Sequence, residues 1–315
     1  MAVNWTSVDA LTRDLIIPKV FDQIFNANPV FFLLDSKGVK ERGGRKIKVP
    51  VRYAMTGATG SYRGFDLLST TKNEKFADPE LDWKQAYSMV IISGLEEIIN
   101  DGAQAVVDLL TQETETAKLS LQEELGSALY GDGTGNDSKD IDGFKAAIDD
   151  GTNVATYGGI TRSASVHTWW RSIYTSWAAT PVSLKAWQAA FGTVTDGGQA
   201  PTHVFTSQDI YDKNYEIVIP SQRLQDDGLA NAGFENIKIN GKTFVVDSHC
   251  AATDAWVVNI NFLSLYVAQG RNFLFKGFQE PVNQDARMGK ILWAGNLVNM
   301  SPRRHARIHT INTAL

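Results

Sequence analysis

The chain has 315 residues, of which 43% are hydrophobic and 21% charged, and its formal net charge at pH 7 is −5. This is the composition of an ordinary soluble protein that can bury a large core, in one large domain or in about two to three smaller ones. The acidic balance gives no electrostatic reason for tight nucleic-acid binding over the whole surface. The single cysteine, Cys250, excludes an intrachain disulfide and any zinc site built on several cysteines.

The first residues carry neither the charged-then-apolar pattern of a secretory signal nor an apolar run of membrane-spanning length. We therefore expect a protein that is made and used in the cytosol, or in something assembled there. Within residues 1–36, apolar side chains are dense but irregularly spaced. This segment is either an arm that packs against other surfaces or a core-forming helix, and the pattern favours neither.

Alternation of apolar and basic residues predicts a strand from Arg45 to Tyr53, and Pro50 indicates an edge position because proline removes a ladder donor. A second alternating run lies between Tyr87 and Ile91, and the residues between the two runs are glycine-rich and polar. We predict a long two-stranded hairpin with an extended tip. Because an isolated hairpin is barely stable in water, it must lie on another surface.

A long amphipathic helix is predicted to begin at Asp101, which with Gln104 forms a helix start, and to end at Gly131 in a left-handed cap. Apolar positions recur at helical spacing along one face. The opposite face is acidic, with Asp108, Glu113, Glu115, Glu123 and Glu124. About 29 residues at 1.5 Å each would span roughly 43 Å, which makes this helix a beam rather than a local packing element.

The glycine-rich residues 131–135 and the following residues 141–144 are predicted to form a tight surface loop. Beyond it, the sequence predicts a helical segment over 167–191, with a helix start at Thr180 and Pro181. A buried strand at 202–206 and a helix capped by Ser207 follow, and then a hairpin over 237–246 with an Asn240–Gly241 turn. Further strands are predicted at 256–260, 263–267, 272–275 and 290–298. The basic tail around Arg303, Arg304 and Arg307 is expected to be a solvated end.

Catalytic motifs are few. The chain has no P-loop, no nucleophile elbow and no His-Glu-x-x-His helix. The glycine-rich residues 131–135 follow a predicted helix, whereas a phosphate-binding loop precedes one.

The oxygens of Ser138, Asp140, Asp142 and Asp149 approximate the spacing of a calcium loop. Serine replaces the first aspartate and the last ligand is Asp rather than Glu, so a solvated acidic turn is the favoured interpretation.

His249 beside Cys250 suggests an activated thiolate. Adjacent residues on a strand point to opposite faces, however, so a buried structural cysteine is favoured. We therefore expect no enzyme activity, no cofactor and no metal site.

A set of segments in a fixed order is more informative than any single motif. An arm and a long basic hairpin precede a long helix that ends in Leu-Tyr-Gly-Asp-Gly-Thr-Gly at 129–135, followed by Ile-Asp-Gly-Phe at 141–144. Gly-Lys-Thr-Phe-Val-Val-Asp-Ser at 241–248, with Asn-Phe at 261–262, and Met-Ser-Pro-Arg-Arg-His-Ala at 300–306 come later. This order resembles the major capsid proteins of tailed bacteriophages, whose Hong Kong ninety-seven fold is shared with encapsulins. The resemblance covers nearly the whole chain.

The resemblance implies an α+β fold in four parts. These are an N-terminal arm (1–40), an extended hairpin loop (41–92), a peripheral domain with a long spine helix (93–150 and 270–300) and an axial α/β domain (151–269 and 301–315). It further implies a virion shell protein, with hexamers and pentamers of this chain tiling an icosahedral shell around double-stranded DNA after assembly in the bacterial host cytoplasm.

Scaffolding and portal proteins, and in some relatives decoration proteins, are the implied partners, and no membrane is involved. No scaffolding segment precedes the arm, so we expect scaffolding to be a separate protein or to have been cleaved away. Some relatives crosslink through a lysine and an asparagine, but no such pair is assigned in this sequence.

A contact between subunits follows from the charges. The basic residues at the hairpin's first strand are Lys40, Arg42, Arg45, Lys46, Lys48 and Arg52. In the family the extended loop lies over a neighbouring subunit, so we hypothesise that this positive strand crosses the neighbour's acidic helix. The alternative is two unrelated solvated faces.

Two other classes of protein remain open at this point. An encapsulin-like compartment would share the fold but enclose a cargo protein, and a groove for a cargo peptide would mark it. A metal-dependent enzyme would use the loop from Ser138 to Asp149.

Overall fold

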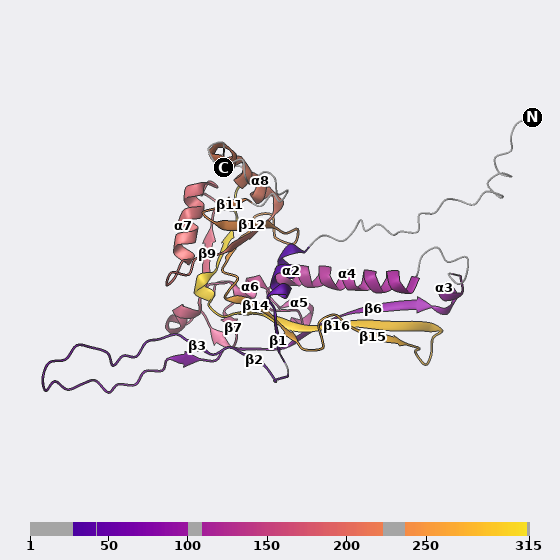
Figure 1. Cartoon of the computed structure of the whole chain (residues 1–315), viewed down its shortest axis with the longest axis horizontal. Coiled ribbons are helices and arrows are strands. Elements are labelled where there is room, and N and C mark those ends of the chain that lie inside the picture. The colour runs from indigo at the N-terminus through magenta and orange to yellow at the C-terminus, as the bar shows by residue number, and fades with distance from the viewer. Residues whose placement is uncertain (1–27, 42, 100–108, 223–236, 314–315) are drawn as a thin grey trace, which may run out of the picture. The chain divides into compact units, whose positions relative to one another are not determined.

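The computed structural model of the chain (Figure 1) describes residues 28–41, 43–99, 109–222 and 237–313. The chain divides into two compact units. The described part of the smaller unit falls within Tyr87–Leu121 and Phe275–Ile291, and that of the larger unit within Asn26–Ala86, Gln122–Leu274 and Leu292–Leu315. The mixture of helices and sheets confirms the predicted α+β class.

Helices occupy a minority of the described residues. They are α2 (Pro29–Ser36), α3 (Gly94–Ile99), α4 (Leu109–Leu129), α5 (Gly135–Ser138), α6 (Phe144–Ala147), α7 (Leu184–Val194) and α8 (Gln208–Gln222), with the 3-10 turns η2 (Ser165–Trp170) and η4 (Pro302–Arg304). The strands are β1 (Val39–Glu41), β2 (Ile47–Lys48), β3 (Val51–Arg52), β4 (Phe76–Ala77), β5 (Glu80–Leu81), β6 (Lys84–Ser93), β7 (Thr156–Tyr157), β8 (Ile160–Thr161), β9 (Ile173–Ser176), β10 (His203–Thr206), β11 (Lys238–Ile239), β12 (Lys242–Val246), β13 (Ala255–Val258), β14 (Leu263–Ala268), β15 (Leu274–Gln279), β16 (Ala286–Asn299) and β17 (Ala306–His309).

A six-stranded sheet, in the order β11-β12-β10-β13-β17-β9, forms the centre of the larger unit. Strand β10 runs parallel to β12 and antiparallel to β13, and β17 runs parallel to β9. The predicted turn between β11 and β12 is confirmed, because Asn240 (φ 54°) and Gly241 (φ 73°) both adopt the left-handed conformation that a tight hairpin turn requires.

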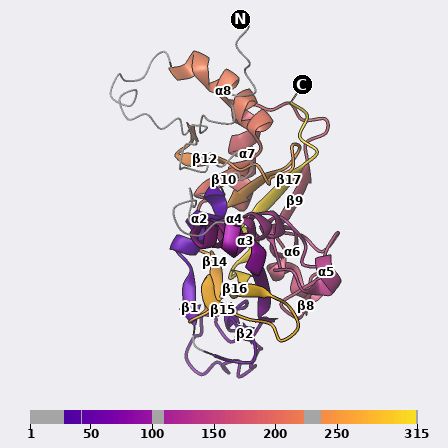
Figure 2. The ribbon, with the colours of Figure 1, turned by 90° about the vertical axis from the view of Figure 1, so that its right-hand side faces the viewer.

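Helices α7 and α8 cover one face of this sheet (Figure 2). Trp187 and Phe191 of α7 pack with Ile210 of α8 and with Val204 and Phe244 of the sheet, and all of these side chains are buried. Leu184, the first residue of α7, is exposed. Helix α7 begins at Ser183, whose side chain accepts a hydrogen bond from Ala186 N–H, rather than at Thr180 and Pro181.

The opposite face of the same sheet packs on the end of α4 and on α6. The ring of Phe144 lies 5.7 Å from Phe205 and 5.6 Å from Trp256, and Tyr130 lies 6.4 Å from Trp256. Phe205 and Val204 are neighbours on β10 with opposite orientations, so one strand serves both faces. The sheet is therefore buried between two layers of helix.

The basic tail is not the solvated end that the sequence suggested. Strand β17 lies inside the six-stranded sheet, between β13 and β9. Both Nε and Nη2 of Arg307 donate to Asp254 Oδ2, at 3.1 and 2.8 Å, and the guanidinium of Arg304 lies 4.2 Å from the ring centroid of Phe262. Apolar residues alternate with the basic ones here, and that alternation produces an internal strand.

A second sheet has the strand order β1-β14-β16-β15, with β6 also paired to β16. In the larger unit β14 runs antiparallel to β16, from Leu263 opposite Asn299 to Val267 opposite Gly295, and β1 runs parallel to β14. In the smaller unit the buried residues of β6, Val90 and Ile92, alternate with exposed ones. The residues 87–91 predicted as the hairpin's second strand therefore belong to β6, which pairs with β16, so that part of the hairpin prediction was wrong.

Helix α3 in the smaller unit begins with a reciprocal cap. Ser93 N–H donates to Glu96 Oε2 at 2.9 Å, and Glu96 N–H donates to Ser93 Oγ at 3.3 Å. These bonds lower the pKa of the Glu96 carboxyl. Nearby, Arg287 pairs with Glu97 at 2.8 Å.

Three further sequence predictions need correction. The segment 167–191 is not helical throughout, because η2 and strand β9 occupy its first part. The positive φ predicted for Gly131 falls on Gly133 (φ 78°), since α4 closes with a tightened turn in which Gly131 N–H donates to Ala128 O at 2.9 Å. The residues 141–144 are not a surface loop, because Ile141 and Phe144 are fully buried.

Candidate functional site

The extended hairpin is anchored at its base by two short ladders. Strand β2 pairs with β5 and β3 with β4, all antiparallel, and Pro50 lies in the break between β2 and β3. Beyond the second ladder, Tyr53 stacks on Trp169 with the ring centroids 4.6 Å apart. The hairpin itself is confirmed, with residues 76–81 rather than 87–91 as its returning strand.

The residues between β3 and β4 form a long loop without regular structure, which runs away from the rest of the larger unit (Figure 1). We call residues 53–75 the hairpin loop. Its exposed large hydrophobic side chains are Met55, Tyr62, Phe65, Leu67 and Leu68, and Phe65 and Leu67 are completely exposed. Because these apolar side chains lie in water, covering them with another surface would lower the free energy.

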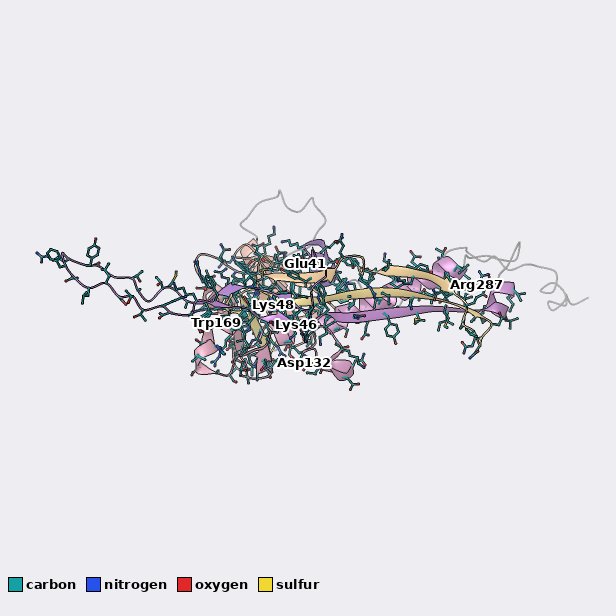
Figure 3. All side chains as sticks on the ribbon, turned by 90° about the horizontal axis from the view of Figure 1, so that it is seen from below. Glu41, Lys46, Lys48, Asp132, Trp169 and Arg287 are labelled. Carbon is teal, nitrogen blue, oxygen red and sulfur yellow. The ribbon has the colours of Figure 1, made fainter. Side chains whose placement is uncertain are left out.

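The basic side of the hairpin is partly neutralised within the chain. Lys46 Nζ lies 3.3 Å from Glu80 Oε2 and 3.8 Å from Asp82 Oδ1, and Lys48 also pairs with Glu80. Figure 3 shows both lysines at the base of the hairpin. The hydrogen bond from Lys48 lowers the pKa of Glu80, and Glu80 raises the pKa of Lys48.

The other basic residues are placed differently. Arg45 and Arg52 are exposed on the hairpin, but Lys40 lies on β1, a strand of the second sheet, and so is not part of the hairpin. Arg42 lies outside the described residues. The free positive charge of the hairpin strand is therefore concentrated at Arg45 and Arg52.

The acidic helix is described as α4 from Leu109 to Leu129, and its predicted start, including Asp108, lies outside the described residues. Its 21 residues at about 1.5 Å each span roughly 32 Å. Glu115 and Glu124 are exposed and Glu113 is half-buried. Glu123 differs from them, since its Oε1 lies 2.8 Å from His249 Nε2 of the same chain.

The partners of these charges were not predicted from the sequence. Glu80 stands opposite Lys48 in the β2–β5 ladder. The alternation of Glu80 and Asp82 with apolar Leu81 is the sequence pattern that could have indicated an acidic strand opposite the basic one. His249 lies 126 residues from Glu123, and no local pattern connects them.

The calcium-like loop does not gather its oxygens. Asp149 is fully buried, and its carboxylate accepts hydrogen bonds from Gly151 N–H at 2.8 Å, Val154 N–H at 3.0 Å and the Asn153 side chain at 2.8 Å. This carboxylate closes its own turn, so the solvated acidic turn expected there was wrong at Asp149. Within the described ranges, no cluster of His, Cys, Asp and Glu is arranged to hold a metal ion.

Asp142 makes a similar structural contact. Its N–H donates to Asn296 Oδ1 at 2.9 Å, and Asn296 Nδ2 donates to Asp142 Oδ2 at 2.6 Å. Burial raises the pKa of the Asp142 carboxyl. The amide of Asn296 also donates to Asp82 O at 2.9 Å, so it ties the segment after α4 to the base of the hairpin.

Cys250 is buried and its thiol donates to Asp254 O at 3.3 Å. Burial, and then the charges of Asp254 and Asp247, raise the pKa of the thiol. A thiol of this kind is a poor nucleophile. Among the described residues, no helix has both the length and the apolarity that a membrane crossing requires.

Comparison with known proteins gives a consistent result at the level of the fold. No protein-family model and no curated protein sequence matches the chain. Among solved structures, the capsid of cyanophage A-1(L) is similar along its whole length, with 17% identity, 98% of this chain and 99% of that chain covered, and a TM-score of 0.72. A capsid chain of a native GTA particle is 11% identical, covers 99% of this chain and 100% of its own, and has a TM-score of 0.67.

An encapsulin of Synechococcus elongatus PCC 7942, solved as the holo-SrpI complex, is also similar. It is 9% identical, with 100% of this chain and 98% of that chain covered and a TM-score of 0.64. These likenesses establish the fold: the chain has the Hong Kong ninety-seven fold of tailed-phage capsid proteins and encapsulins, as the sequence predicted.

Proposed function

We propose that this chain is the major capsid protein of a tailed bacteriophage. The observation that carries the proposal is the end-to-end likeness to the cyanophage capsid chain, in which 98% of this chain and 99% of that chain are covered. The exposed apolar side chains of the hairpin loop support the proposal independently, because a neighbouring copy of the chain would cover them. The role is structural and involves no catalysis.

In the proposed shell, hexamers and pentamers of the chain enclose double-stranded DNA without sequence-specific binding. Residues 1–40 act as the N-terminal arm, 41–92 as the extended loop, 93–150 and 270–300 as the peripheral domain, and 151–269 and 301–315 as the axial domain. Scaffolding, portal and decoration proteins are the proposed partners, and assembly takes place in the cytoplasm of the bacterial host.

The hairpin of one copy is proposed to cross the acidic face of α4 in the next. Arg45 and Arg52 supply the positive charge that the chain itself leaves exposed, and Glu113, Glu115 and Glu124 supply the negative charge. Lys46 and Lys48 contribute less because both pair with Glu80, and Glu123 contributes less because it bonds to His249 of its own chain. Each exposed pair contributes only ~0–1 kcal/mol, but repetition around a ring sets the register between copies.

An encapsulin-like compartment is the second candidate, favoured by the encapsulin's TM-score of 0.64 over 100% of this chain. Expression of the chain alone, followed by light scattering and negative-stain microscopy, tests both candidates, which predict closed particles or rings. A compact monomer at all accessible concentrations and salts would contradict both. The contents of particles made in phage-infected cells then separate them, because a capsid holds nuclease-protected DNA and a compartment holds a cargo protein.

A further inference from the structure

His249, in the turn between β12 and β13, has a carboxylate oxygen at each of its ring nitrogens. Nδ1 lies 3.0 Å from Asp247 Oδ1, and Nε2 lies 2.8 Å from Glu123 Oε1 of helix α4. The imidazole side chain is 9% exposed, and the side chain of Asp247 is 2% exposed. The second oxygen of Glu123, Oε2, is buried and makes no hydrogen bond within the described structure. The imidazole and Asp247 are therefore largely out of water, while the Glu123 side chain, at 31% exposed, reaches the site from its edge.

Without a proton on the imidazole, the carboxylates of Asp247 and Glu123 have no cationic partner at this site. The buried hydroxyl of Tyr130, at the end of α4, faces Asp247, and burial together with that carboxylate raises the pKa of Tyr130 well above its ordinary value. The thiol of Cys250 is neutral for the same reasons. Arg307, whose charge acts on the Cys250 thiol, is held by Asp254 at 2.8 Å.

When both carboxylates are ionised, the two hydrogen bonds at His249 require a doubly protonated imidazole. A doubly protonated imidazole donates from both nitrogens, whereas a neutral ring donates from one and turns a lone pair toward the other acceptor. Charge-assisted hydrogen bonds are roughly twice as strong as neutral ones, and a lone pair facing a carboxylate is repulsive. Histidine is also the side chain that changes charge within the physiological pH range.

We propose that His249 is a proton-dependent clamp that fastens the C-terminal half of helix α4 to the turn between β12 and β13. The clamp is closed at mildly acidic pH, where the imidazole bonds to Glu123 and Asp247 together. It loosens at alkaline pH, where one of the two bonds is lost. The clamp operates within one folded chain, so it stands or falls independently of shell formation.

Cys250 provides a built-in reporter of this clamp. It is the only cysteine of the chain, it follows His249 directly, and it is buried in the same turn. The rate of Cys250 alkylation by iodoacetamide measures how often the turn opens. Wild type, Glu123→Gln and Glu124→Gln are compared at about pH 6 and at about pH 8.5, each variant against wild type at the same pH so that the thiolate fraction cancels. Glu124 is exposed on the same helix and serves as the matched control.

At about pH 6, Glu123→Gln is expected to react about tenfold faster than wild type, since it loses the charge-assisted half of the clamp. At about pH 8.5 the ratio falls to about one, because the wild-type clamp is then already weakened. Glu124→Gln stays at a ratio of about one at both pH values. A Glu123→Gln ratio that is the same at both pH values, or an equal acceleration by Glu124→Gln, would overturn the proposal.

If alkylation is too slow to measure, hydrogen exchange of two backbone amides replaces it. His249 N–H donates to Asp247 Oδ1 at 3.0 Å and Cys250 N–H donates to Asp247 O at 3.1 Å, so both amides report on the same turn. Their protection, corrected for intrinsic rates, should be lower at about pH 8.5 than at about pH 6 in wild type and independent of pH in His249→Gln. Equal protection of the wild type at both pH values would also overturn the clamp.

Discussion

Gly143 lies directly against the last turn of α4: a β-carbon on Gly143 would stand only 2.5 Å from the carbonyl oxygen of Leu129. The same β-carbon would stand 2.6 Å from the carbonyl oxygens of Ala128 and Gly131. Lys145 N–H, two residues further along the chain, donates to Gly131 O at 3.1 Å. The segment Ile-Asp-Gly-Phe therefore closes the C-terminal end of the helix and buries its own apolar residues beneath it.

Gly143→Ala should destabilise the chain by about 2–4 kcal/mol, because three backbone carbonyls surround the added methyl group and none of them is a flexible side chain. Urea unfolding followed by circular dichroism measures this. Gly192→Ala is the matched control, since Gly192 is exposed on α7 with open space around it. The control should gain about 0.5–1 kcal/mol from helix propensity. Equal effects of the two substitutions would show that Gly143 is not a packing constraint.

His305 should make the folded chain sensitive to acid. It is fully buried, Asn259 N–H donates to its Nδ1 at 3.3 Å, and burial together with the charge of Arg304 lowers its pKa to about 3. Between the unfolded value of about 6.5 and this folded value, the unfolded chain binds more protons than the folded one. The contribution is therefore complete above about pH 6.5 and is lost as the pH falls toward 3.

The expected loss from this residue between pH 7 and pH 5 is about 2 kcal/mol in the free energy of unfolding. His305→Asn removes the titrating group and offers Oδ1 as an acceptor for Asn259 N–H, so its stability should fall less over the same interval. Subtracting one variant from the other cancels the contribution of the carboxylates. Parallel stability curves for wild type and His305→Asn would contradict this prediction.

The hairpin loop should be dispensable for folding and required for assembly. Gly57 and Asn73 lie close enough that a β-carbon on Gly57 would meet the Asn73 side chain, so a short Gly-Ser linker can replace residues 58–72. The melting temperature should change by less than about 2 °C because these residues bury little surface. Light scattering should show monomers in place of rings or shells. Phe65→Ser with Leu67→Ser should weaken assembly, and Thr71→Ser with Lys72→Ser, on the same loop, should not. A loop-deleted chain that still forms shells would show that assembly does not depend on the loop.

Charge reversal tests the proposed contact of the hairpin with α4. Glu113→Lys with Glu115→Lys should block assembly at low salt, and Arg45→Glu with Arg52→Glu in the same chain should partly restore it. Glu123 is excluded from the design because it bonds to His249. Glu216→Lys on α8 is the control for added positive charge and should assemble normally. If the double reversal on α4 assembles as well as the parent chain, the hairpin of the neighbour lies elsewhere.

Local patterns were sufficient to predict several elements. The Asn240–Gly241 turn and the buried strand β10 depend on neighbouring residues, and both are present. The acidic and basic runs were also visible. The partners of these charges within the chain were not visible, because Lys48 pairs with Glu80 on the returning strand and Glu123 bonds to His249 in a turn far along the chain.

The errors have a common physical cause. Alternation in residues 87–91 shows that β6 is a strand, but not that its partner is β16 rather than β2. Similarly, the basic tail alternates with apolar residues, and its insertion between β13 and β9 depends on strands distant in sequence. Pairing of strands and pairing of charges are tertiary properties, and a single sequence without tertiary contacts does not contain them.

In the proposed shell, a neighbouring copy of the chain covers each hairpin loop. Electron cryo-microscopy of particles assembled from the purified chain would show whether this contact forms. We expect closed particles built of rings of six and five copies, with Phe65 and Leu67 of every copy buried against the next. Closed particles in which the hairpin loop points into solvent, or a chain that stays monomeric at every concentration, would contradict it.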